Sequence, residues 1–191
     1  MKLRYVALWI AALCILMFIL QIAFSTEPFL LIKEKKLSEP WRLITAVFAH
    51  SNIEHLLSNL FSLILFGLIL EGRIGARRVL VLFLASGILI NIISPYDRSL
   101  GASGALFAII GALIVLRPLM IVWLYSMPLP LFLAGIIWHA IDLFGVFYPQ
   151  GIGNLAHLSG LFMGLALGIY WRRFRFLGDD HQKERGETQV L

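Results

Sequence analysis

The sequence has little charge and almost no cysteine. Only 14% of its 191 residues are charged, whereas 60% are hydrophobic and the mean hydropathy is +0.87. Soluble domains contain roughly 45–50% apolar residues, so this composition excludes an ordinary soluble domain. The single cysteine, Cys14, excludes an internal disulfide, and we interpret it as a packing residue within a helix.

The N-terminal region lacks the cleavage site of a secretory signal peptide. Tyr5–Phe24 is an uncharged apolar run that is longer than the central region of most signal peptides, and no small-x-small site follows it. We therefore expect this segment to be retained as a first transmembrane helix.

Long apolar segments predict an all-α membrane protein with six spans in one bundle, because a helix needs about 20 residues to cross the hydrocarbon core. The apolar stretch 117–130 is broken by three prolines, so we interpret it as interfacial. We expect residues 1–177 to form the membrane domain and residues 178–191 to form a short disordered cytoplasmic tail. The predicted spans are Tyr5–Phe24, Ile53–Leu70, Val79–Ile93, Ser103–Leu116, Leu131–Phe147 and Leu155–Trp171.

The distribution of basic residues predicts the orientation. With the N-terminus in the cytoplasm, the inner side holds 11 of the 16 Lys and Arg residues, and the outer side keeps five of them. The positive-inside rule therefore predicts a multi-pass protein of the cell membrane with both termini in the cytoplasm. The same bias explains the net charge of +5 without a nucleic-acid partner. The five outer residues are Lys33, Lys35, Lys36, Arg42 and Arg98.

The stretch LGASGALFAIIGA places Ser103 at the start of an apolar segment. This fourth span is short, so the chain before it must enter the membrane as a loop, which is tolerated only beside protein or a water-filled cavity. A helix N-terminus favours developing negative charge. We therefore interpret Ser103 as a nucleophile at a helix that begins below the outer surface, with His157 as its base.

Small residues accompany this histidine at four-residue intervals. Gly160, Gly164 and Gly168 form a stripe beside His157, and Gly104 begins a matching stripe in the fourth span. Such stripes allow two helices to approach closely. Packing accounts for the glycines, but it does not account for a histidine at this depth.

Four polar side chains are predicted at one level of the membrane. At 1.5 Å per residue, Ser103 and His157 both lie about 21 Å from the inner interface. Asn59 and His55, on one face of the second span, lie about 18 and 24 Å from it. Polar residues in a membrane interior are costly and therefore indicate function.

The start of the second span reads HSNIEHLLSNL. Ser51 and Glu54 fit a capping box, which gives Glu54 a structural role. His50 and His55 lie about 140° apart around a helix, and the sequence contains neither H-E-x-x-H nor H-x-x-E-H. We therefore expect no metal and no cofactor.

Several motifs resemble the rhomboid family in their order along the chain. GASG is similar to G-x-S-G, and AHLSGLFMGLALG is similar to A-H-x-x-G-x-x-x-G-x-x-x-G. WRLITAVFAHSNIEHLLSNL resembles W-R followed by H-x-x-x-x-H-x-x-x-N, and LEGRIG resembles E-x-R-x-G. The resemblance runs from Trp41 to about Gly168.

The resemblance implies a six-helix intramembrane serine protease that cleaves transmembrane substrates with a dyad of Ser103 and His157. It implies that His55, Asn59 and the Ser103 backbone N–H bind the oxyanion, with Gly101 and Gly104 supporting the active site. It also implies that Glu71 and Arg73 brace the inner loops and that the region of Arg42 forms a half-buried first loop.

One departure concerns the position four residues after the serine. The family often has Tyr there, stacked on the catalytic imidazole, and this chain has Phe107. Phe107 lies one turn after Ser103, and we expect its ring to stack on His157 equally well, because stacking needs no hydroxyl.

Three alternatives stay open at this point. The chain is a protease, a membrane-protein chaperone of the same fold that does not use its dyad, or a transporter. No coupling-ion carboxylate lies at the predicted midplane, which disfavours transport. Asp142 lies near the outer end of the fifth span, and we favour an interaction with His139 or with the helix end over a catalytic role. The expected partners are transmembrane protein substrates and the lipid bilayer.

Overall fold

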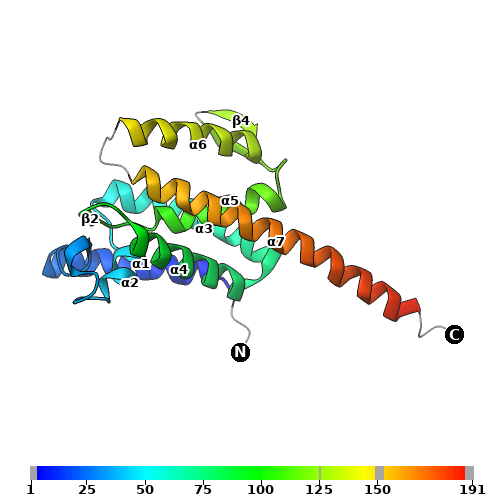
Figure 1. Ribbon diagram of the computed structural model, residues 1–191, viewed down its shortest axis with the longest axis horizontal. Helices are drawn as coiled ribbons and strands as arrows, with labels where there is room; N and C mark the ends of the chain where they lie inside the picture. Colours follow the sequence, from blue (N-terminus) through cyan, green and yellow to red (C-terminus); the bar gives the residue numbers. More distant parts are fainter. Residues whose placement is uncertain (1–3, 125, 149–152, 188–191) are drawn as a thin grey trace.

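The computed structural model describes residues 4–124, 126–148 and 153–187, and it is built mainly of helices (Figure 1). Two short antiparallel strand pairs, β1–β2 and β3–β4, accompany them. The helices are α1 (Val6–Phe24), α2 (Arg42–Phe48), α3 (Ile53–Ile74), α4 (Ala76–Ile93), α5 (Ser103–Leu116), α6 (Leu131–Phe147) and α7 (Asn154–Glu187), with a 3-10 turn at Lys33–Lys35.

Three helices are long and apolar enough to cross a membrane, namely α1, α3 and α4. The apolar helices α5 and α6 are shorter. Each of the six predicted spans coincides with one of the helices α1, α3, α4, α5, α6 and α7, and the first five differ from their helices by only a few residues at the ends. The sixth differs more, because α7 continues past Trp171 to Glu187 and so includes most of the stretch 178–191 that we expected to be disordered. That all six cross the bilayer, and that the membrane domain ends at residue 177, stay predictions.

Two connections contain structure that the apolar pattern does not predict. The first connection contains α2 and β1 (Leu31–Ile32), and β1 pairs with β2 (Arg98–Ser99) in the loop before α5. The apolar stretch between α5 and α6 forms a hairpin of β3 (Ile121–Leu124) and β4 (Met127–Pro130). Two of its prolines lie in β4 and the third precedes β3. Both strands of this two-stranded hairpin are edge strands, which tolerate proline because they do not need every backbone N–H for pairing.

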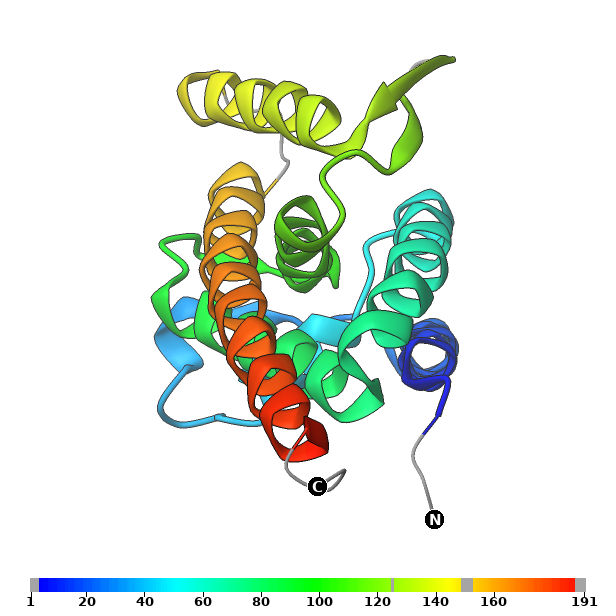
Figure 2. The ribbon, with the colours of Figure 1, turned by 90° about the vertical axis from the view of Figure 1, so that its right-hand side faces the viewer.

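The helix α5 lies at the centre of the bundle, between α3, α4, α6 and α7 (Figure 2). Nearly all of its side chains from Gly104 to Leu113 are buried. A helix that is apolar on every side is expected in such a central position. Because α5 is surrounded by other helices, its first residue is held from several directions.

The most extensive contact in the bundle joins α5 to α7. A Cβ atom added to Gly160 would collide with the carbonyl oxygen of Gly104, and one added to Gly164 would collide with that of Ala108. The two backbones therefore touch directly along this line. This is the contact geometry that small residues at four-residue spacing permit.

Polar side chains attach the ends of several elements to their neighbours. The Glu71 carboxylate accepts the backbone N–H groups of Tyr5 and Val6 and so caps the start of α1. Arg42 is buried in the first connection, donates to the carbonyl oxygens of Glu27 and Leu30, and forms an ion pair with Glu39. The bonds of Arg42 hold the first connection together, and those of Glu71 attach the start of α1 to α3.

We expect Gly164→Ala to destabilise the bundle, because the new methyl group would force α5 and α7 apart; overpacking of this kind costs about 1–3 kcal/mol. Gly72→Ala in α3 is the matched control, since a Cβ there meets nothing within 4 Å. Thermal unfolding in detergent micelles should show a lower midpoint for Gly164→Ala, and an unchanged or higher one for Gly72→Ala. Equal midpoints for the two variants would contradict the close packing of α5 and α7.

Candidate active site

Ser103 is the first residue of α5 and follows a loop with an unusual backbone. Gly101 has a φ angle of +123°, which other residues rarely adopt, and its N–H donates to the carbonyl oxygen of Ala46 at 2.8 Å. A Cβ at Gly101 would also lie 2.9 Å from the His55 ring. Gly101 therefore allows the loop to turn tightly and to place Ser103 beside α3.

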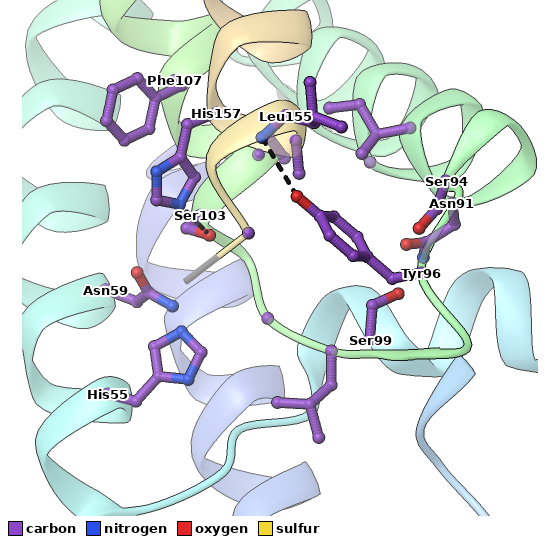
Figure 3. Close-up of a pocket in the computed structure, with 18 of the residues that line it drawn as sticks. His55, Asn59, Asn91, Ser94, Tyr96, Ser99, Ser103, Phe107, Leu155 and His157 are labelled. Carbon is purple, nitrogen blue, oxygen red and sulfur yellow. Dashed lines mark hydrogen bonds between the residues drawn. The ribbon is translucent and has the colours of Figure 1, made fainter. Parts of the chain in front are cut away.

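His157 lies in the first turn of α7, opposite the start of α5. Its Nε2 atom is 2.8 Å from the Oγ atom of Ser103 (Figure 3). The two residues are 54 positions apart in the chain and are brought together by the contact of α5 with α7. Gly104 contributes to this approach, since a Cβ there would lie 3.3 Å from the carbonyl oxygen of Ala156.

Asp142 of α6 contacts the other side of the same imidazole. Its Oδ1 atom is 2.9 Å from Nδ1 of His157. The expected interaction between Asp142 and His139 is wrong: the Nδ1 atom of His139 is buried without a partner among the described residues, and its ring packs edge-on against Phe162. A spacing of three residues in one helix does not reveal that the neighbouring helix offers a closer partner.

The ring of Phe107 stacks on the imidazole of His157. Their centroids are 4.4 Å apart and their planes differ by 7°. Trp138 of α6 packs edge-on against the same phenyl ring. The aromatic contact predicted for Phe107 is therefore present in the structure.

His55 and Asn59 extend from α3 toward Ser103 (Figure 3). The predicted capping box of Ser51 and Glu54 is wrong. Asn52 caps α3 instead, accepting the backbone N–H of His55 at 2.8 Å. The hydroxyl of Ser51 is 3.1 Å from Nδ1 of His55, so Ser51 contacts the imidazole rather than the helix end.

His50, the first histidine of the motif H-x-x-x-x-H-x-x-x-N, is a further residue of the site, to which the sequence assigned no role. It is buried, and because its Nδ1 lies 3.0 Å from the carbonyl oxygen of Phe48, this nitrogen must donate. Its Nε2 therefore accepts from the amide of Asn59 at 2.9 Å, which orients that amide. Burial, assisted by the neighbouring His55, lowers the pKa of His50 to about 4, so the imidazole stays neutral at neutral pH.

A cavity of about 830 Å³ lies beside these groups. Its walls include Ser103, His157 and most residues of the loop before α5, from Ser94 to Gly101. Tyr96 of this loop accepts the backbone N–H of Leu155 at 3.4 Å (Figure 3), which connects the loop to the start of α7. Among the described side chains, no three His, Cys, Asp or Glu residues gather as metal ligands do.

Taken together, the geometry brings Ser103, His157, His55, Asn59 and Phe107 to one site. A hydroxyl within hydrogen-bond reach of an imidazole is the arrangement that nucleophilic catalysis requires. The first N–H groups of α5 have no partner within the helix, as at the start of every α-helix, and Ser103 is the first residue of this helix.

Comparison with known proteins gives a consistent result. A family model described as Rhomboid domain matches residues 37–174. RHOMBOID-like protein 6, mitochondrial, of Arabidopsis thaliana is 36% identical over 151 residues, which cover 72% of this chain and 48% of that protein. Rhomboid-like protease 2 of Toxoplasma gondii is 34% identical over 143 residues, covering 71% and 49%. Rhomboid protease GlpG of Haemophilus influenzae is 26% identical over 178 residues, covering 89% and 92%.

The chain therefore spans about half the length of the plant and Toxoplasma relatives and most of the length of the bacterial one.

We expect Phe107→Leu and Phe107→Ala to slow the reaction of Ser103 with a fluorophosphonate probe, because the loss of stacking frees the imidazole. Aromatic contacts are worth about 0.5–1.5 kcal/mol beyond area burial, which corresponds to a slowing of about 2- to 12-fold. Phe107→Tyr keeps the ring and should react at the wild-type rate. Labelling rates at matched thermal stability test this, and an unimpaired Leu variant would rule out a role for stacking.

Proposed function

The chain belongs to the rhomboid family, and on this basis we propose that it is an intramembrane serine endopeptidase that cleaves transmembrane segments near the outer face of the bilayer. The observation that carries the proposal is the distance of 2.8 Å between the Ser103 hydroxyl and Nε2 of His157 at the start of a buried helix. Two of the relatives carry the word protease in their names, which is consistent with this activity.

In the proposed reaction, Nε2 of His157 takes the proton of Ser103 while the serine oxygen attacks the scissile carbonyl carbon. The tetrahedral intermediate collapses to an acyl-enzyme, and the imidazolium returns its proton to the leaving amine. Water then attacks the acyl group, with His157 again as base. The second product leaves with a free carboxylate, and the serine hydroxyl is restored.

The developing oxyanion needs donors on the side of Ser103 that faces α3. We assign this role to His55, Asn59 and the backbone N–H of Ser103. Neutral His50 accepts one N–H of Asn59, which holds the amide in a fixed orientation. If the Ser51 hydroxyl donates to Nδ1 of His55, the proton of that imidazole is on Nε2, the nitrogen beside Gly101. Donors fixed in advance are the most effective oxyanion stabilisers.

We place the protein in the cell membrane, with six spans and with both termini in the cytoplasm. The fourth, α5, has 14 residues and a length of about 21 Å, less than the hydrocarbon core of about 30 Å. Ser103 would then lie below the outer surface. The buried hydroxyls of Ser94 and Ser99, which line the cavity and have no partner among the described residues, favour access of water to this depth.

The proposed substrates are membrane proteins whose outer transmembrane segment unwinds easily. A regular helix in lipid has all of its backbone groups paired, so the scissile carbonyl is shielded until the helix opens. Gly or Pro just after the cut should therefore favour cleavage. A small residue before the cut is expected from the family resemblance.

We expect Ser103→Ala and His157→Ala to abolish cleavage of a tagged single-span substrate with Gly or Pro near its outer end, while EDTA leaves the wild type active. Cleavage in liposomes measured by gel shift, together with fluorophosphonate labelling, provides the test. A chaperone of the same fold would bind the substrate without cleavage or labelling. Wild-type cleavage by Ser103→Ala, or loss of activity in EDTA, would refute the serine mechanism.

We expect His55→Ala and Asn59→Ala each to lower kcat by about 10²–10³-fold, the loss typical of one oxyanion donor. The thermal unfolding midpoint should stay near that of the wild type for His55→Ala and fall for Asn59→Ala, because the latter leaves the buried Nε2 of His50 without a donor. Turnover is therefore compared at a temperature at which all variants are folded. Ser58→Ala is the matched control on α3, because Ser58 donates only to the carbonyl of its own helix at His55. Normal turnover of both alanine variants would contradict the oxyanion role and would mean that His55 and Asn59 only form hydrogen bonds between elements of the bundle.

A further inference from the structure

We propose that Asp142 is a positioning residue for His157 in the reaction proposed above, on which this inference rests. Its carboxylate holds the imidazole in the tautomer that can accept the Ser103 proton, and it stabilises the imidazolium that forms. The proposal adds a third side chain, from a third helix, to the pair of Ser103 and His157.

The two ring nitrogens of His157 have different partners. Nδ1 is 2.9 Å from Oδ1 of Asp142, and Nε2 is 2.8 Å from Oγ of Ser103. An ionised carboxylate only accepts hydrogen bonds, so Nδ1 must carry the proton, and Nε2 has the free lone pair. The contact with Asp142 therefore selects the tautomer in which His157 can act as a base toward Ser103.

The contact is also shielded from water. The side chains of His157 and Asp142 are 14% and 8% exposed. A carboxylate this buried is costly unless it is paired, and His157 is the only cationic or potentially cationic partner of Asp142 among the described side chains. The attraction is strongest when the imidazole is protonated, which occurs in the tetrahedral intermediate. Asp142 thus stabilises the intermediate more than the resting state, and such differential binding accelerates reactions.

The structure explains how a residue of α6 reaches α7 at this point. Gly145, nearly one turn after Asp142, lies so close to the Asn154 side chain that a Cβ would collide with it. The absence of a side chain at Gly145 lets the end of α6 approach the start of α7. His157 lies one turn beyond Asn154 and therefore faces Asp142.

Asp142 and Phe107 constrain the imidazole in different ways. The stacked ring of Phe107 keeps the imidazole in one plane but does not prevent a 180° flip about the Cβ–Cγ bond, which preserves that plane. It also does not distinguish the two nitrogens. The hydrogen bond from Nδ1 to Asp142 fixes both the rotation and the tautomer, so the loss of Asp142 should be more severe than the loss of Phe107.

The test compares Asp142→Asn with His139→Gln, which changes a polar side chain one turn away on α6 that does not contact the site. We expect Asp142→Asn to lower kcat by at least about 10²-fold, and by up to about 10⁴-fold if the amide selects the wrong tautomer, with KM changed less than about threefold. His139→Gln should retain wild-type kcat. Rates of fluorophosphonate labelling should follow kcat, because they report on the same serine without a substrate helix.

The outcomes separate the two proposals. Suppose that the wild type cleaves the substrate and reacts with the probe, and that Asp142→Asn does both at rates within about threefold of the wild-type rates. Asp142 is then not a positioning residue, and the serine mechanism stands. If the wild type neither cleaves nor labels, the proposed function itself is wrong. A rise in KM with unchanged kcat would also overturn the positioning role, because it would assign Asp142 to substrate binding.

A second pair of variants covers the case in which Asp142→Asn does not fold. The side chains introduced by Asp142→Glu and Asp142→Gln have the same length and differ in charge. We expect Asp142→Glu to be at least about tenfold more active than Asp142→Gln at equal thermal stability. Equal activities would overturn the proposal, since a purely structural side chain would not distinguish a carboxylate from an amide.

Discussion

The direct backbone contact between α5 and α7 is the constraint on which the rest of the structure depends. A methyl group at Gly160 or Gly164 would collide with a carbonyl oxygen of α5, so the two helix axes are as close as the chain permits. Ser103 and His157 each lie in the first turn of one of these helices. Their separation is therefore set by the packing of two rigid helices, and small changes in that packing act directly on the reacting atoms.

The polar side chains of the site are arranged in sets from neighbouring elements. The carboxylate of Asp142, the imidazole of His157 and the hydroxyl of Ser103 form one line across α6, α7 and α5. Neutral His50 and Asn59 form a second line beside it, from the first connection to α3. Each buried polar atom in these lines has a partner, which lowers the cost of placing polar groups in an apolar bundle.

The sequence allowed the main helices and the pairing of Ser103 with His157 to be predicted, because helix rise converts residue number into depth. The same arithmetic does not give the rotation of one helix against another. For this reason it missed the contact of Asp142 with His157 and the support of Asn59 by His50. Capping was also misassigned at Ser51, since neighbouring Ser and Asn compete for the same helix end and a nearby imidazole decided the outcome.

The hydrogen bond from Gly101 to the Ala46 carbonyl has a mechanical consequence. Ala46 belongs to α2, a short helix that begins beside an exposed Trp41 and carries an exposed Ile44. A force applied to α2 is therefore transmitted through one hydrogen bond to a backbone segment that ends at Ser103 two residues later. The bond thus connects α2, at the edge of the bundle, to the loop that leads into its central helix α5. The position of the serine oxygen therefore depends on this bond as well as on the packing of α5 against α7.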